Sequence, residues 1–218
     1  MNQRILLFIV SFMMVLGCNQ SAKEKTKIIL PVPGEITNQE TNETIDTVKK
    51  YEIKSGIVRY QVILKTISVD MRYHTILYFD NFGARECKDT YAGDTLMESN
   101  MSDGKKTYKI DHIKKIAYYL GKAHYGVEPK YGWDNIAAED IKSGKVKKLP
   151  NKIIAGKSCE AYEVNTGIAS VTFGGWKNIN VLADIHSPGG KSFTIATFIS
   201  TEGTPEEKFI IPPKYKIK

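Results

Sequence analysis

Apolar and polar residues alternate along most of the chain from Tyr51 onward. Within residues 57–64, Val58 and Tyr60 fall on one face of an extended chain, whereas Arg59 falls on the other. A period of two is typical of half-buried β-strands. We therefore expect about eight to eleven antiparallel strands, with strand-like runs at residues 57–64, 72–80, 84–91, 106–111, 114–120, 153–165, 169–173, 179–184 and 192–200.

Turn-forming residues separate these runs. Glycine and asparagine adopt the positive φ angles that tight hairpin turns require. We expect turns at residues 80–83, Asp103-Gly104, Gly174-Gly175 and 188–190.

Residues 134–142 follow a helical pattern instead. Asp134 is a good N-cap, Ile136 and Ile141 recur at helical spacing, and Gly144 is a typical C-terminal stop. A sheet with long apolar faces and few helices buries those faces by curling on itself. The pattern thus predicts a mainly β fold of the α+β class: an antiparallel, curled, half-open β-barrel with one or a few short helices.

The N-terminus has the order of a bacterial export signal. Arg4 precedes an uninterrupted apolar run at residues 5–16, which ends at Gly17-Cys18. The run is shorter than the roughly 20 apolar residues that a transmembrane helix needs. Its end is similar to a lipobox, where the thiol is alkylated with diacylglycerol and the chain is cleaved before the cysteine. We predict a lipoprotein signal peptide at residues 1–17 and lipidation of Cys18; an ordinary signal peptide with an incidental Cys18 is the alternative.

The remaining chain divides into a tether and one domain. Residues 18–50 are rich in charged and amide side chains and poor in aromatics, which favours a flexible, lipidated tether. Residues 51–218 are long enough for a single antiparallel β-barrel-like domain. Asn19 is not the aspartate that retains some lipoproteins at the inner membrane. We therefore expect a monomer in the cell envelope, anchored to the outer membrane and facing the periplasm.

The charge of the chain is positive but dispersed. The formal net charge is +7 at pH 7, mostly from scattered lysines. Scattered lysines usually form a solvated surface, and they also attract anionic lipid headgroups. Nucleic acid is excluded as an expected partner because the export signal separates the protein from it.

Two cysteines remain once Cys18 carries lipid. Cys87 and Cys159 lie in a compartment that permits disulfides. A bridge between them would close a loop of about 70 residues and add roughly 4 kcal/mol to stability on the chain-entropy model. Two buried free thiols are the alternative, and the spacing does not decide between them.

Residues that typically support catalysis or metal binding lack the required spacing. The histidines, at positions 74, 112, 124 and 186, occur singly, and neither H-E-x-x-H nor C-x-x-C is present. No G-x-S-x-G sequence marks a nucleophile. We expect no enzymatic activity, no metal and no cofactor.

Aromatic residues are more suggestive of a binding site. Tyr118, Tyr131 and Trp133 cluster before the expected helix, and Trp176 follows a pair of glycines. Ligand pockets are mostly apolar with a few polar groups. These four residues are candidates for the mouth of an apolar pocket; ordinary packing in the core and turns is the alternative.

Four sequence stretches, taken in order, resemble the LolA-like outer-membrane lipoprotein family of Bacteroidota, whose members include lipoprotein carriers and acceptors. They cover much of the domain and lie at residues 76–86, 102–111, 154–162 and 209–215. The resemblance implies a half-open antiparallel β-barrel wrapped around helices. It also implies an apolar interior that, in carrier members, holds the acyl chains of lipoproteins.

Two functional hypotheses follow. The first is a lipid-anchored, non-enzymatic protein that binds an apolar ligand, such as a lipid or a lipoprotein acyl chain, in a continuous cavity. The second is an envelope module for protein–protein interaction with a filled core and no ligand.

Overall fold

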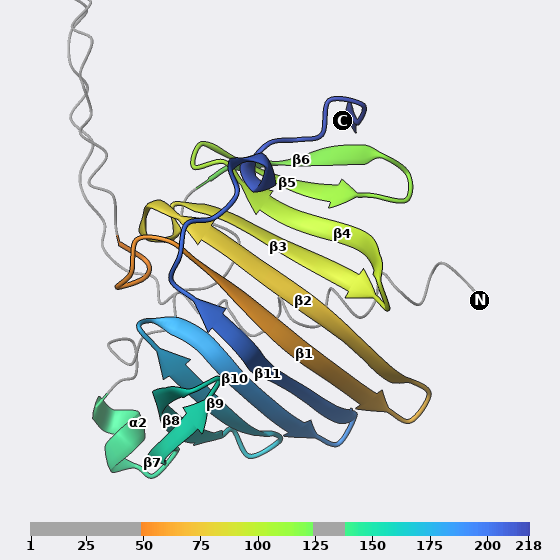
Figure 1. Cartoon of the computed structure of the whole chain (residues 1–218). Coiled ribbons are helices and arrows are strands. Elements are labelled where there is room, and N and C mark those ends of the chain that lie inside the picture. The colour runs from red at the N-terminus through yellow and green to blue at the C-terminus, as the bar shows by residue number, and fades with distance from the viewer. Residues whose placement is uncertain (1–48, 124–137) are drawn as a thin grey trace, which may run out of the picture. The chain divides into compact units, whose positions relative to one another are not determined.

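The domain is built on one large, curled sheet that is antiparallel except where β12 pairs with β6. The computed structural model describes residues 49–123 and 138–218. Twelve strands form the sheet in the order β12-β6-β5-β4-β3-β2-β1-β11-β10-β9-β8-β7 (Figure 1). Its end strands, β12 and β7, do not pair with each other, so the sheet is not closed. The mainly β, curled and open architecture predicted from the alternation is confirmed.

Most strands pair with the strand that precedes or follows them in the chain, and short turns connect them. The described elements are β1 (Gly56–Thr66), β2 (Asp70–Asp80), η2 (Asn81–Gly83), β3 (Arg85–Ala92), β4 (Thr95–Ser102), β5 (Lys106–Asp111), β6 (Ile116–Lys122), α2 (Ala138–Lys142), β7 (Val146–Ile154), β8 (Lys157–Asn165), β9 (Ser170–Trp176), β10 (Ile179–Ser187), β11 (Gly190–Ser200), η4 (Glu206–Phe209) and β12 (Lys216–Ile217).

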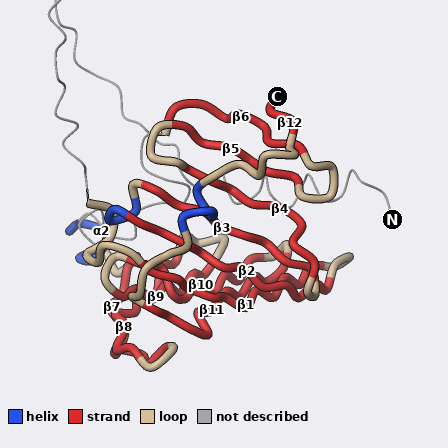
Figure 2. Tube along the Cα trace, turned by 45° about the horizontal axis from the view of Figure 1, so that its top comes forward, coloured by secondary structure: helices blue, strands red, loops and turns tan. Residues whose placement is uncertain are grey.

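The two halves of the sheet bury opposite faces. Alternation along β2 shows this directly, because Leu77 and Phe79 enter one hydrophobic cluster and Tyr78 enters the other. The first cluster lies within the curl from β2 to β7, where β7 approaches β11 although β8, β9 and β10 lie between them in the sheet. The second lies on β2 to β6 beneath the C-terminal segment, residues 204–218 (Figure 2).

The first described residues are fixed to the sheet. Lys50 and Tyr51 both donate backbone hydrogen bonds to the carbonyl oxygen of Phe82. The Lys50 ammonium contacts the Glu86 carboxylate, which is fully buried. Tyr51 is 2 % exposed and packs edge-on against Phe79. These contacts make residues 50 and 51 part of the packed domain.

Some strands and turns differ from the prediction. The expected strand at 153–165 is two strands, β7 and β8, because Ala155 and Gly156 both adopt positive φ and form a turn. Gly174-Gly175 is not a turn but part of β9; the turn lies at Lys177-Asn178, both with positive φ. The sequence pattern also missed β4 and the two-residue β12, so the described residues form twelve strands where eight to eleven were expected.

The described part of the predicted helical segment is helical. α2 covers Ala138–Lys142, and Asp134, the expected N-cap, lies outside the described residues. The predicted stop is confirmed, since Gly144 has φ +75° and its N–H bonds to the Ile141 carbonyl oxygen. In the described parts of the chain, every helix is too short or too polar to cross a bilayer.

Candidate functional site

The two predicted aromatic residues that the structure describes, Tyr118 and Trp176, do not meet in one site. Tyr118 lies on β6 and is half-buried, facing the same side as its cross-strand partner Lys109. Trp176 ends β9, packs against the first cluster, and has the Lys157 ammonium 5.2 Å from the centre of its ring. Seven strands separate β6 from β9 in the sheet. Tyr131 and Trp133, like Cys18, lie outside the described residues.

The two domain cysteines are free and buried, so the bridge considered above is not formed. Cys87 belongs to the second hydrophobic cluster and Cys159 to the first. They lie on β3 and β8, which are separated by five strands. Because the clusters occupy opposite faces of the sheet, the two sulfur atoms cannot approach bonding distance without refolding.

The interior of the curl is filled by side chains. Val58, Phe79, Ile179 and Val181, all from the first cluster, have exposed fractions of zero. A cavity of about 50 Å³ remains beside this cluster, lined by Tyr51, Tyr60, Leu77, Lys88, Asn180, Leu182 and Thr194. Typical ligand pockets measure about 300 to 1,000 Å³. A cavity of this size holds a few water molecules and not an acyl chain.

The cavity also has polar walls. The Asn180 side-chain oxygen is buried and accepts no hydrogen bond from the described protein groups. Outside the lining, the buried Thr75 hydroxyl on the strand next to Tyr60 also has no hydrogen-bond partner among the described groups. Buried polar groups of this kind are usually satisfied by ordered water. Water is therefore a better occupant of this cavity than hydrocarbon.

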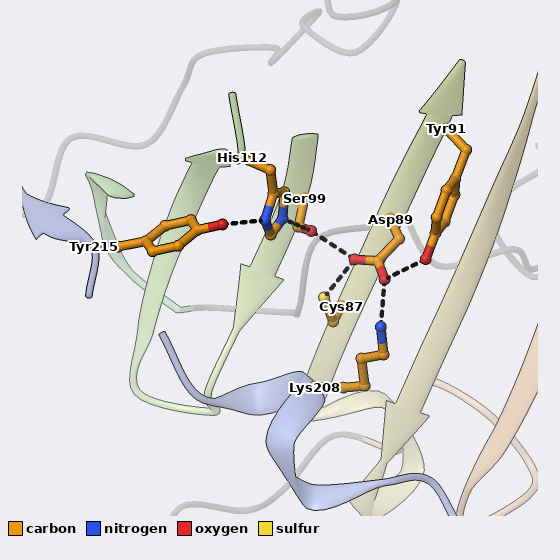
Figure 3. A network of polar contacts seen from close by, with 7 residues as sticks. All are labelled: Cys87, Asp89, Tyr91, Ser99, His112, Lys208 and Tyr215. Atoms are coloured by element: carbon orange, nitrogen blue, oxygen red, sulfur yellow. Dashed lines mark hydrogen bonds and ion pairs between the residues drawn. The ribbon is translucent and has the colours of Figure 1, made fainter. Parts of the chain in front are cut away.

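A second polar site lies on the other face, beneath the C-terminal segment (Figure 3). Its centre is Asp89, whose side chain is 2 % exposed. The carboxylate accepts hydrogen bonds from the Ser99 hydroxyl at 2.5 Å and from the Lys208 ammonium at 2.6 Å. Cys87 and Tyr91 donate longer contacts of 3.3 and 3.4 Å. Asp89 thus gathers groups from β3, β4 and η4.

The network continues through a histidine to the last residues of the chain. The Ser99 hydroxyl lies 2.7 Å from Nε2 of His112, and Nδ1 of His112 lies 3.0 Å from the Tyr215 hydroxyl. A neutral His112 with its proton on Nε2 satisfies every member, because Tyr215 then donates to Nδ1 and Nε2–H donates to Ser99. The chain of hydrogen bonds from Tyr215 through His112 and Ser99 consequently ends at the Asp89 carboxylate.

Burial and charge shift the acidities in this network. Burial raises the pKa of the Cys87 thiol far above its ordinary value, and the Asp89 carboxylate adds to the effect. Burial lowers the pKa of His112, which favours the neutral imidazole. For Lys208, burial acts to lower the pKa, but the hydrogen bond and charge of Asp89 outweigh it and the pKa is raised. Lys208 and Asp89 therefore form an ion pair in which the carboxylate is buried and the ammonium is partly buried.

The network combines a serine and a histidine at a distance compatible with nucleophilic catalysis, but its arrangement differs. Ser99 is 2 % exposed, and its hydroxyl proton is directed at Asp89. The far nitrogen of His112 faces a tyrosine and not the carboxylate that would orient it. In this arrangement a substrate cannot reach the serine oxygen. The geometry instead fastens residues 208 and 215 to the sheet.

Sequence reasoning missed this network because its members are far apart in the chain. Lys208 and Asp89 are separated by 119 positions, and Tyr215 and His112 by 103. The available signal was the alternation in β3, where Cys87, Asp89 and Tyr91 fall on one face, with an aspartate among apolar positions. Within the described residues, no group of three or more metal-binding side chains converges.

Comparison with known proteins gives structural similarity only. No model of a known protein family matches the sequence, and no curated protein sequence matches it. An uncharacterized conserved protein from Thermus thermophilus aligns with a TM-score of 0.50 and 4 % identity, covering 77 % of this chain and 91 % of that one. The two chains share the fold.

Similar solved structures also include one described as a LolA superfamily protein and one described as a lipoprotein-sorting domain. A LolA superfamily protein from Nitrosomonas europaea has a TM-score of 0.35 and 10 % identity, covering 74 % of this chain and 94 % of that one. A putative outer membrane lipoprotein-sorting protein domain from Vibrio parahaemolyticus has a TM-score of 0.34 and 11 % identity, covering 72 % and 89 %. These scores are too low to carry a functional conclusion.

Proposed function

We propose that this protein is a lipid-anchored lipoprotein of the bacterial cell envelope whose domain is a non-enzymatic, LolA-like binding module with a filled core. Its anchor is Cys18, and its expected site is the periplasmic face of the outer membrane. The partner binds to the outside of the sheet and not within it. This is the second of the two hypotheses that the sequence raised.

The filled first cluster carries this proposal. A C16 acyl chain needs a pocket several times larger than the cavity of about 50 Å³ beside Tyr60 and Leu77. Val58, Phe79 and Val181 fill that region, which stabilises the curl and leaves no room for an acyl chain. Binding of an internal acyl chain is the second candidate, and the four LolA-like sequence stretches favour it.

Native mass spectrometry of the protein purified from membranes of its host separates the two candidates. We expect a covalent diacylglycerol adduct on the wild-type chain, absent from a Cys18→Ala variant, and no additional lipid retained by the domain. Retention of one non-covalent lipid per chain, surviving in the Cys18→Ala variant, would contradict the filled-core proposal and support the acyl-chain candidate. A wild-type chain without the adduct would refute the lipid anchor.

A further inference from the structure

Neighbouring connections at one rim of the sheet expose large apolar side chains. Ile67, in the β1–β2 turn, is 98 % exposed, and Ile168, in the β8–β9 turn, is 79 % exposed. Among the large hydrophobic residues of the described chain, these two have the highest exposed fractions. Pro188 in the β10–β11 turn and Ile141 in α2 are exposed as well. Exposed apolar groups that gather on one surface mark an interaction site more often than scattered ones do.

The strand register places these turns side by side. Thr66 at the end of β1 pairs with Gly190, which brings the β1–β2 turn next to the β10–β11 turn. Ser170 at the start of β9 pairs with His186, which brings the β8–β9 turn to the other side of the β10–β11 turn (Figure 1). A shallow, open groove of about 320 Å³ runs between the last two turns.

Basic side chains surround the apolar tips. Lys65 precedes the Ile67 turn, and Lys191 follows the Pro188 turn. Lys142 and Lys145 flank the end of α2, which leads into β7 at the same rim. Three acids near the tips are paired: Asp70 with Lys65, Asp140 with Lys145 and Asp184 with His186. Lys142 and Lys191 add positive charge beyond these pairs.

We propose that this rim is a peripheral contact with an anionic lipid bilayer, in which Ile67 and Ile168 enter the interfacial region and the lysines contact the headgroups. Apolar tips ringed by lysine have the two components of interfacial binding, buried hydrocarbon and attraction to anionic lipid. Each lysine near such a surface raises affinity by about fivefold.

The point at which the chain enters the domain allows this contact in a protein that carries the proposed lipid anchor. The chain enters the domain at the opposite rim, where Tyr51 bonds to Phe82 and Glu52 bonds to Lys177. An 11-residue strand such as β1 spans about 36 Å. The roughly 30 residues predicted for the tether span up to about 100 Å when fully extended, well beyond the length of that strand. The anchored domain can therefore rest this rim on its own bilayer, and the tether raises the effective concentration of that bilayer.

Vesicle flotation tests the proposal without the anchor. The mature chain carrying Cys18→Ser is mixed with vesicles of phosphatidylethanolamine and phosphatidylglycerol, or of phosphatidylcholine alone. We expect binding to the anionic vesicles that weakens with salt, as screened charges require. Ile67→Ser combined with Ile168→Ser should lower the affinity about tenfold or more. The matched control is Ile153→Ser, since Ile153 is 75 % exposed but lies beside the β7–β8 turn at the opposite rim.

Three outcomes would overturn the proposal. The first is a chain that does not float with anionic vesicles, and the second is equal binding by the double variant and the Ile153→Ser control. The third is a concentration-dependent dimer in analytical ultracentrifugation, abolished by the double variant, which would assign the rim to a second copy of the chain. Since the flotation protein carries no lipid, these results are independent of whether Cys18 is modified in the host.

Discussion

At the scale of single residues, Asp89 explains how the C-terminal segment is held. A buried carboxylate without partners is strongly destabilising, yet Asp89 accepts hydrogen bonds from four side chains and is paired with Lys208. Phe209, the next residue, belongs to the second cluster, and the Lys208 ammonium lies 4.4 Å from the centre of the Tyr78 ring in that cluster. The hydrogen bonds of Asp89 and the apolar contacts of the second cluster thus hold the same C-terminal segment on the sheet.

His112 makes the stability of this arrangement depend on pH. Its pKa lies below the ordinary value of 6.5 because burial disfavours the imidazolium. A base with a lowered pKa in the folded state contributes its full stability above the unfolded pKa, and this contribution is lost as the pH falls from 6.5 through the folded value.

We therefore expect the free energy of unfolding to decrease with falling pH below 6.5, by at most about 1.4 kcal/mol per pH unit from this group. A His112→Gln variant keeps a donor and an acceptor but does not titrate, so its slope in the same interval should be shallower. Urea unfolding followed by circular dichroism between pH 7 and pH 5 measures both slopes. Identical slopes for the two proteins would contradict the prediction, because they would mean that His112 has the same pKa in the folded and unfolded states.

At the scale of elements, the contact between β9 and β10 depends on a glycine. Gly174 is buried in β9, and a Cβ added there would lie 2.9 Å from the Cβ of Leu182 on β10. Atoms at that distance must separate, and both are held by strand pairing. The side chain of Leu182 fills the space that a side chain at position 174 would occupy.

Gly174→Ala should lower the free energy of unfolding by about 1 to 3 kcal/mol, the usual cost of overpacking a core. The matched control is Gly203→Ala, since no heavy atom lies within 4 Å of a Cβ at position 203. That variant should be unchanged or slightly stabilised, by about 0.5 kcal/mol, because alanine restricts the unfolded chain. Chemical denaturation of the two variants checks the difference; equal stabilities would mean that β10 yields at Leu182 at no cost.

The same glycine shows why the sequence predicted strands better than turns. Alternation identified β1, β2 and β5 because one-sided burial imposes a period of two, and for β5 even the bounds agree with the prediction. Gly174-Gly175 has the composition of a turn, and only the neighbouring Leu182, eight positions later in the chain, reveals that Gly174 serves close packing. The turn at Lys177-Asn178 has one turn-forming residue, Asn178, and no glycine, so the glycine pair just before it was the stronger local signal.

At the scale of the whole domain, one sheet serves two cores. The predicted half-open barrel has a single interior, whereas the structure buries one face from β2 to β7 and the opposite face from β2 to β6. Which face a strand buries depends on how far the sheet curls and on what covers it. The C-terminal segment supplies that cover through Phe209, Ile211 and Tyr215, which pack on the second cluster. Periodicity within single strands contains no information about such long-range covering.

The two-core arrangement predicts the reactivity of the cysteines. Cys87 is 3 % exposed in one cluster and Cys159 is fully buried in the other, so neither thiol is accessible and the two cannot pair. In the mature chain carrying Cys18→Ser, we expect no labelling by iodoacetamide under native conditions and two adducts in urea without reductant, counted by intact mass spectrometry. Ser68→Cys, in the exposed β1–β2 turn, should label at once in the folded protein and confirm that the reagent is active. A denatured chain that takes up label only after reduction would reveal a disulfide and contradict the separation of the two cores.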